Sequence, residues 1–341
     1  MRYLIVGYPG LIARAALRCV ERWAPGVAVD VLVTDPKHVR EIEARATESS
    51  VNLCAWRGEF DAVDFGLSGA DYTRLAALTR RVLWCVEPVR DGGSLERSPL
   101  LRGASELVEF CRASEALEGA VYLSTIFALG TTTGTVSESE LRVGQKFAER
   151  FEEAAAVGER IVERAQLTLP ITVARAVPAL GDAETGECPP DGALPRLVHA
   201  LLASPAVVVA SFSGEPVHVA PADWLASALV RLMDAPEARG RRVHLADPGP
   251  PTDARFLGLV AHACERRIDE RPLAGLRGRP QSPLSKLDAL EARALRGWAV
   301  RWDAREAQAL LGEDATPPHL EDYISRLVEW CRSQDAGGSI R

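Results

Sequence analysis

No apolar run in this sequence reaches the roughly 18 to 20 residues that a membrane-spanning helix needs. Apolar residues make up 47% of the chain and mean hydropathy is −0.02, which is typical of a globular protein. A basic excess is also missing, because 40 lysines and arginines face 47 aspartates and glutamates and give a formal net charge of −7. This charge argues against nucleic acid or an anionic membrane as the main partner.

Motifs for metal ions and for disulfides are absent as well. The seven cysteines form no C-x-x-C pair and mostly stand in apolar surroundings, so we expect reduced core thiols in a cytoplasmic protein. The six histidines stand far apart with no H-x-x-x-H pair, which argues against a metal site. Met1 and Arg2 lead directly into a strand pattern, so no signal peptide is expected before the fold.

Strand and helix patterns alternate through the first half of this 341-residue chain, which is long enough for one large domain or two ordinary ones. Strands this apolar, separated by helices, imply a parallel sheet that is covered on both faces. Because such crossovers are right-handed, we expect an α/β fold with a doubly wound Rossmann sheet. Strands are expected at 3–7, 27–35, 50–56, 80–87, 119–130 and 170–181, and a long helix at about 143–165.

The alternation breaks after Gly181, where 182–195 is rich in proline, glycine and acidic residues and is expected to lead away from the sheet. The segments 215–233 and 241–247 are typical of a strand, a helix and a strand that return to it. Proline-rich breaks separate the helical patterns after Pro250. We therefore predict a Rossmann core of 1–185 and 216–250, a smaller, discontinuous C-terminal lobe of 186–215 and 251–335, and a tail of 336–341.

Small residues stand between the first strand and the first helix in the pattern G-x-x-G-x-x-A, at Gly7, Gly10 and Ala13. The first permits a tight turn, the second lets the backbone approach a phosphate, and the third lets helix and strand pack closely. Leu11 and Ile12 begin the helix, so all five residues are candidates for binding the pyrophosphate of a dinucleotide. The alternative is a tight turn that holds no ligand.

Asp35 ends the second expected strand. A carboxylate at this place accepts hydrogen bonds from an adenosine ribose and repels a 2′-phosphate, which favours NAD(H) over NADP(H). The alternative is that Asp35 only caps the helix that follows it.

With these features the chain resembles the extended short-chain dehydrogenase/reductase family, and within it the branch of thioester-reductase and fatty-acyl-reductase domains. The resemblance implies NAD(H) or NADP(H) as cofactor, with Glu59 of the third-strand region among the residues that bind it. It also implies a small-molecule or carrier-protein-linked substrate, and it allows a homodimer. The similar segments are 58–72, 121–130, 175–187, 217–233, 241–247, 301–312 and 317–330.

The family's chemistry implies a Ser or Thr that positions a carbonyl oxygen, and a Tyr four residues before a Lys on one helix. That spacing places both side chains on one face, where the Lys lowers the pKa of the Tyr and holds the nicotinamide ribose. Thr125 matches the Ser/Thr position, but Phe151 and Ala155 stand at the Tyr and Lys positions. None of the five tyrosines has a lysine four residues later, and Lys146 is expected on another helical face. A positioned acid contributes about 10²–10⁴-fold, so ordinary ketone reduction is not expected.

Glu87 is a second departure, because it ends the fourth expected strand where the family implies a small residue beside the cofactor phosphates. Two negative charges about 4 Å apart repel by about 4 kcal/mol at an effective dielectric of 20, which is about a thousandfold in affinity. We therefore expect weak dinucleotide binding unless Glu87 turns away, is protonated or pairs with Arg90. Glu87 and Thr125 are the candidate catalytic residues. Lys146 and Glu152 are weaker candidates, for which a solvated helix face is the simpler interpretation.

Three further residues have structural interpretations. Arg175 is expected either to support the cofactor turn or to pair with an acidic residue. Asp223 and Trp224 match a position that packs the lobe against the core in the family that the chain resembles.

Three functions follow from these observations. The first is an NAD(P)-dependent oxidoreductase that uses another proton source, and the glycine pattern with Asp35 favours it. The second is a tailoring enzyme that uses the same scaffold for a different reaction on a small-molecule or thioester-linked substrate. The third is a non-catalytic protein that binds a ligand or a partner. Phe151, Ala155 and Glu87 favour the second and third, between which an open polar pocket would favour the enzyme and a filled one the binding protein.

Overall fold

A computed structural model describes residues 1–87, 98–139, 141, 144–203, 207–209, 212–270, 295 and 297–337. Its centre is a parallel seven-stranded sheet in the order β11-β7-β5-β4-β1-β2-β3. This order reverses direction between β1 and β4, which confirms the doubly wound α/β fold and places the switch point beside the glycine pattern. The strands are β1 (Arg2–Val6), β2 (Ala28–Val33), β3 (Asn52–Arg57), β4 (Arg81–Trp84), β5 (Gly119–Thr125), β7 (Ile171–Ala176) and β11 (Arg242–Leu245).

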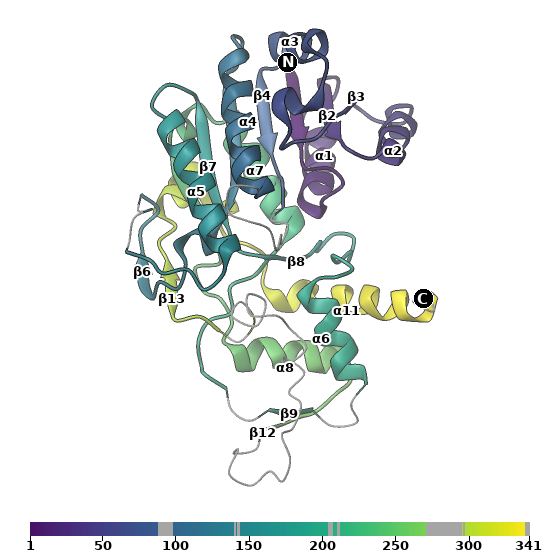
Figure 1. Cartoon of the computed structure of the whole chain (residues 1–341). Helices are drawn as coiled ribbons and strands as arrows, with labels where there is room; N and C mark the ends of the chain where they lie inside the picture. The colour runs from purple at the N-terminus through teal and green to yellow at the C-terminus, as the bar shows by residue number, and fades with distance from the viewer. Residues whose placement is uncertain are drawn as a thin grey trace.

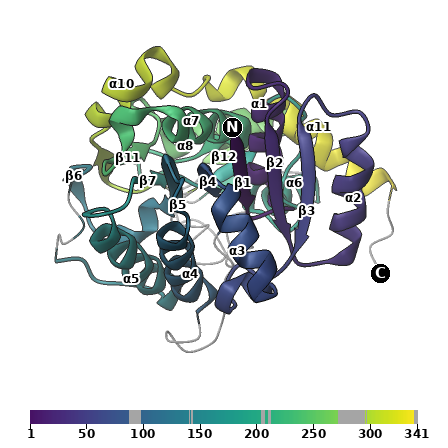
Figure 2. The same cartoon turned by 90° about the horizontal axis from the view of Figure 1, so that it is seen from above.

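Helices cover both faces of this sheet, as the view from above shows (Figure 2). One face carries α1 (Leu11–Trp23) and α7 (Ala222–Asp234), and α2 (Pro36–Ala46) lies beside β3. The other face carries α3 (Gly69–Leu78), α4 (Pro99–Ala113) and α5 (Arg150–Ala165). Alanines of α1 are buried against the sheet, and their small size lets helix and strands approach closely. Because the strands are parallel, their carboxyl ends meet at one edge, where the candidate site residues stand.

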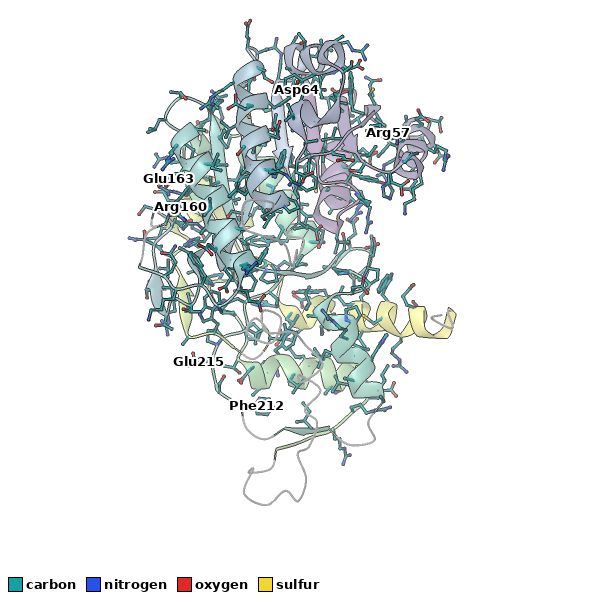
Figure 3. All side chains as sticks on the ribbon, viewed as in Figure 1. Arg57, Asp64, Arg160, Glu163, Phe212 and Glu215 are labelled. Atoms are coloured by element: carbon teal, nitrogen blue, oxygen red, sulfur yellow. The ribbon has the colours of Figure 1, made fainter. Side chains whose placement is uncertain are left out.

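A second cluster of helices lies at the carboxyl end of the sheet (Figure 1). It contains α6 (Ala193–Leu202), α8 (Asp253–Ala263) and α11 (Leu320–Gly337), which pack through their own apolar residues. Phe212 packs against this cluster, and the carbonyl oxygen of Glu215 accepts a hydrogen bond at the start of α8 (Figure 3).

Short strand pairs complete the fold. They are β8 (Ala179–Gly181) with β10 (Ala220–Pro221), β9 (Val207–Val209) with β12 (Ile268–Glu270), and β6 (Gly134–Val136) with β13 (Val300–Trp302). A short helix, α10 (Arg305–Leu311), packs near β11.

Four sequence expectations about these elements are wrong. The strand expected at 119–130 ends at Thr125, and Ile126–Leu129 form a short 3-10 helix. The strand expected at 170–181 is divided into β7 and β8, and β8 leaves the main sheet to pair with β10. The segment from 215 therefore does not return to the main sheet, whereas β11 does. The helix expected from about 143 begins at Arg150, because the side chain of Glu149 caps it.

The predicted division into core and lobe remains a prediction. One stretch of the predicted lobe packs with the core. Its buried residues belong to the same apolar cluster as α1 and α7, and they are Trp298, Val300, Trp302, Ala307 and Leu311. In the sequence-based division these residues lie within the lobe segment of 251–335. All seven cysteines are free thiols, and six of them are buried. No helix in the described ranges is both long enough and apolar enough to span a bilayer.

Candidate functional site

The turn after β1 depends on Gly7. Its φ of +120° favours glycine, and a Cβ there would lie 2.4 Å from the carbonyl oxygen of Cys85 on the neighbouring strand. The amide of Gly10 donates to the carbonyl oxygen of Gly7 at 2.8 Å, and Gly10 is the N-cap residue of α1 without a side chain to cap it. The turn therefore presents the N-terminal N–H groups of α1 toward the carboxyl edge of the sheet.

Glu87 occupies the space in front of these N–H groups. The amide of Ile12 donates to Glu87 Oε1 at 2.9 Å, and a Cβ on Gly10 would lie 2.8 Å from the same oxygen. Burial raises the pKa of this carboxyl, and the hydrogen bonds from the Ile12 and Leu11 amides oppose that rise. The sequence predicted Glu87 beside the cradle, which is the glycine turn together with the N-terminus of α1. It did not predict that the Glu87 carboxylate accepts a hydrogen bond from this helix terminus. Arg90, its expected partner, lies outside the described residues.

Two cavities flank Glu87, and its side chain lines both of them. The first, of about 200 Å³, we call the Thr125 cavity. The second, of about 280 Å³, we call the outer cavity, and Gly7, Gly10, Thr34 and Phe60 are among its lining residues. The Thr125 cavity is lined mainly by apolar residues of β5, β7, the β7–β8 turn and α6, together with Glu87, Ser124 and Thr125.

Phe151 and Ala155 both lie near Thr125. Phe151 lines the Thr125 cavity, and its ring meets that of Phe127 edge-on at 6.3 Å. Ala155 and Thr125 line a small void of about 10 Å³ on the other side. Thr125 Oγ1 accepts a hydrogen bond from the Phe127 amide at 3.3 Å. The structure thus brings together the three positions that the family resemblance assigns to catalysis, on β5 and one face of α5.

The two acidic residues expected to bind the cofactor line neither cavity. Asp35 is the N-cap of α2, where its side chain accepts from the Lys37 amide at 2.8 Å, and this bond holds the pKa of the carboxyl below its usual value. Glu59 is exposed in the turn after β3, where its amide donates to the Phe65 carbonyl oxygen. Their roles toward a cofactor remain predictions.

Neither of the two weaker candidates, Lys146 and Glu152, lies on a solvated helix face. Glu152 is fully buried, and its carboxylate accepts from the amides of Ala148 and Glu149 in a capping box. Lys146 is exposed in the loop before α5, and its carbonyl oxygen accepts from Thr131. Glu152 therefore fixes the start of the helix, and Lys146 lies outside the helix altogether.

A buried polar chain lies behind the site, and the sequence revealed only one of its members. Arg175 donates to Glu159 Oε1 from Nε at 2.8 Å and from Nη2 at 2.6 Å, and both side chains are fully buried. Ser124, the neighbour of Thr125, donates to Glu159 Oε2 at 2.7 Å. Arg175 Nη1 lies 3.2 Å from His244 Nε2, which completes the chain. Of the two roles expected for Arg175, the structure shows the pairing with an acid.

Asp223 and Trp224 hold peripheral segments against α7. Asp223 accepts a hydrogen bond from the Ala183 amide at 2.9 Å, in the turn after β8. The Trp224 indole donates to the Asp314 carbonyl oxygen at 2.9 Å. These contacts agree with the structural interpretation of both residues.

The buried imidazole of His244 should make stability depend on pH. Burial and the nearby Arg175 charge lower its pKa to about 3, and its Nδ1 lies 2.8 Å from the Asp303 carbonyl oxygen. The unfolded chain binds this proton near pH 6.5, whereas the folded chain does not. We therefore expect the free energy of unfolding to fall by about 1 kcal/mol per pH unit from this group as pH drops below 6.5.

Urea unfolding at pH 7.0, 6.0 and 5.0 measures this effect. His244→Gln should flatten the dependence, whereas His262→Gln, at an exposed position on α8, should retain it. Equal slopes in all three proteins would contradict the assignment.

Comparisons with known proteins agree with this architecture. The family model of the male sterility protein, an NAD-binding family, matches residues 34–229, so the match begins after the glycine turn. No curated protein matches the sequence. In the described ranges, no group of acidic, histidine and cysteine side chains could hold a metal ion.

Several solved structures share the fold. The terminal R domain from the myxalamid PKS-NRPS biosynthetic pathway is 18% identical, with a TM-score of 0.79 over 99% of this chain and 92% of that chain. A thiolation-reductase di-domain from an archaeal non-ribosomal peptide synthetase is 14% identical, with a TM-score of 0.75 over 99% and 76%. UDP-glucuronic acid 4-epimerase from Bacillus cereus, in complex with NAD, is 14% identical, with a TM-score of 0.71 over 98% and 99%.

The dinucleotide that the family implies fits this cradle only in part. Gly7 and the N-terminus of α1, whose N-cap residue Gly10 has no side chain, suit a pyrophosphate. Glu87 does not, because its carboxylate takes the Ile12 amide and would stand against the phosphates. With Glu87 in this position, the residues present do not fit the group.

Proposed function

We infer a function from the family to which this chain belongs, the NAD-binding family of the male sterility protein. We propose a cytoplasmic tailoring enzyme that acts on a small-molecule or thioester-linked substrate in the Thr125 cavity, and that does not reduce ordinary ketones. The observation that carries this proposal is an open cavity at Thr125 whose wall holds Phe151. The binding site remains, while the residues that would deliver the proton are replaced.

The Thr125 cavity suits the apolar part of a substrate. An apolar cavity of about 150 Å³ is large enough to hold a benzene ring, so one of about 200 Å³ takes a ring or a short acyl chain. In the described part of the chain no acceptor takes the proton of the Thr125 hydroxyl, which leaves it available for a carbonyl oxygen. One structure similar to this chain is a thiolation-reductase di-domain, and this pairing of a reductase with a thiolation domain supports a carrier-linked thioester as the substrate.

A ligand series tests this proposal. Short-chain acyl thioesters of N-acetylcysteamine should bind about fourfold more tightly for each added methylene until the cavity is full, because each buried methylene contributes about 0.8 kcal/mol. Binding is measured by calorimetry, and turnover by mass spectrometry of the thioester. Ala193→Phe, which fills the cavity from α6, should weaken binding at least about tenfold.

Ala200→Phe is the matched control, because it adds the same ring on α6 away from the cavity. Equal binding by the two α6 variants would contradict the assignment of the cavity. Thr125→Val keeps the shape of the side chain and should weaken thioesters more than hydrocarbons of similar size.

A second function, a non-catalytic binding protein, is favoured by the mainly apolar lining of the same cavity. It would show the same dependence on chain length, but the thioester would be recovered unchanged after prolonged incubation. An oxidoreductase with another proton source would instead consume a nicotinamide cofactor with the bound substrate.

A further inference from the structure

Glu87 lies where the first turn of α1 would receive an anion from outside. Its Oε1 accepts from the Ile12 amide at 2.9 Å, and helix N-termini attract negative charge. We propose that Glu87 is a built-in ligand of the α1 N-terminus, that it excludes nicotinamide dinucleotides from the cradle, and that it leaves the Thr125 cavity to uncharged ligands. This inference concerns cofactor specificity and goes beyond the proposed function.

The absence of a side chain at Gly10 leaves room for the Glu87 carboxylate at the N-terminus of α1. The φ of Gly10, −50°, is open to any residue, so the backbone conformation does not require glycine there. A side chain at this position would instead collide with Glu87 Oε1 at 2.8 Å and with the Gly7 carbonyl oxygen at 2.9 Å. The glycine that would otherwise admit a phosphate thus provides the space that Glu87 occupies.

The backbone before Glu87 is anchored to the cradle. The Cys85 amide donates to the Val6 carbonyl oxygen at 2.7 Å, and the Cys85 carbonyl group packs against Gly7. Glu87 follows two residues later, so this anchoring directs it toward α1. Arg14, a basic side chain whose charge lowers the pKa of Glu87, is already paired with Glu187 at 2.5 Å and donates to the Pro9 carbonyl oxygen.

The charge of Glu87 is therefore balanced mainly by the helix. No basic side chain in the described ranges forms an ion pair with it. A pyrophosphate would compete for the same N–H groups and would meet a carboxylate instead of a small residue. An uncharged ligand in the Thr125 cavity meets neither obstacle.

Glu87 also separates the Thr125 cavity from the outer cavity, since it lines both. A ligand that spans the two cavities must displace it, whereas a ligand confined to one need not. Because a dinucleotide is long enough to span both, it is the class of ligand that this side chain selects against.

The test compares NADH and NADPH binding to the unmodified full chain, Glu87→Ala, Glu87→Gln and Glu48→Ala, by fluorescence titration up to 1 mM. The unmodified chain and Glu48→Ala, which changes an exposed residue, should show no saturable binding. Glu87→Ala should bind NADH at least about a hundredfold more tightly, in line with the loss of one repulsive charge. Glu87→Gln should lie between them, because it removes the charge and retains the bulk.

Micromolar NADH binding by the unmodified chain would overturn the inference. The inference would also be overturned if both Glu87 variants had the melting temperature of the unmodified chain and still bound NADH as weakly as it does. Glu87→Gln keeps a side-chain oxygen for the Ile12 amide, so it guards against loss of the fold in Glu87→Ala. The thioester test of the proposed function uses neither variant, so the two can fail separately.

Discussion

Carbonyl reduction should appear in the triple variant Phe151→Tyr, Ala155→Lys, Glu87→Ala and be absent from the unmodified chain. The two changes on α5 restore a Tyr and a Lys one turn apart, beside Thr125. The Tyr hydroxyl would then donate a proton to the carbonyl oxygen, and the Lys charge would lower the pKa of the Tyr. We expect NADH-dependent reduction of a simple aldehyde to rise about 10²–10⁴-fold over the Glu87→Ala background.

Because Ala155 is buried, the control for this experiment must introduce a lysine at an equally buried position. Ala155 is 4% exposed and packs with Ala128 and Ala156, so a lysine there should cost about 1–3 kcal/mol of stability. Ala154 is 3% exposed on the same helix, and Phe151→Tyr, Ala154→Lys, Glu87→Ala therefore has a similar packing cost with the wrong spacing. Only the i,i+4 pair should gain activity.

Either of two results would contradict this prediction. The first is a rate of about 1 s⁻¹ or more for the unmodified chain with a simple carbonyl, which is ordinary for an enzyme. The second is a folded triple variant that binds NADH and has no more activity than its Glu87→Ala background.

The sheet was predictable because its signals are local. Apolar strands alternate with amphipathic helices, and parallel strands bring their carboxyl ends to one edge. The strands β1, β2, β4, β5 and β7 therefore lie within the segments expected to form strands, although several of them are shorter than expected. The meeting of Thr125 with Phe151 and Ala155 follows in the same way from helical spacing and the position of β5. These features need only periodicity and topology.

The parts that could not be predicted depend on contacts between distant residues. Glu159 pairs with Arg175 and Ser124 across two elements, and neither its position nor its neighbours in sequence mark it as buried. The start of α5 was missed because Glu149 is outside the usual set of N-cap residues. The sequence predicts that the negative charge of Glu87 repels phosphates. Only the structure shows that its carboxylate accepts a hydrogen bond from the Ile12 amide.

Loss of Arg175 should destabilise the protein more than any other single change discussed above. Arg175 and Glu159 are both fully buried, so Arg175→Met leaves a carboxylate in the interior without its cation. Breaking such a pair costs about 3–5 kcal/mol, because the charge that remains has lost its compensation. The measurement is the free energy of unfolding from urea titrations at pH 7.

A change at Glu159, the partner of Arg175, tests whether the loss of stability comes from the unpaired charge. Glu159→Gln with Arg175→Met removes both charges and keeps an oxygen that can accept from Ser124, so this double variant should be more stable than Arg175→Met alone. Arg22→Met, which breaks an exposed pair with Glu184, should cost less than about 1 kcal/mol. If the effects of Arg175→Met and Glu159→Gln, measured singly, simply added up in the double variant, the two buried side chains would not stabilise the fold as a pair. Coupling between them would instead show that the two side chains stabilise the fold as a pair.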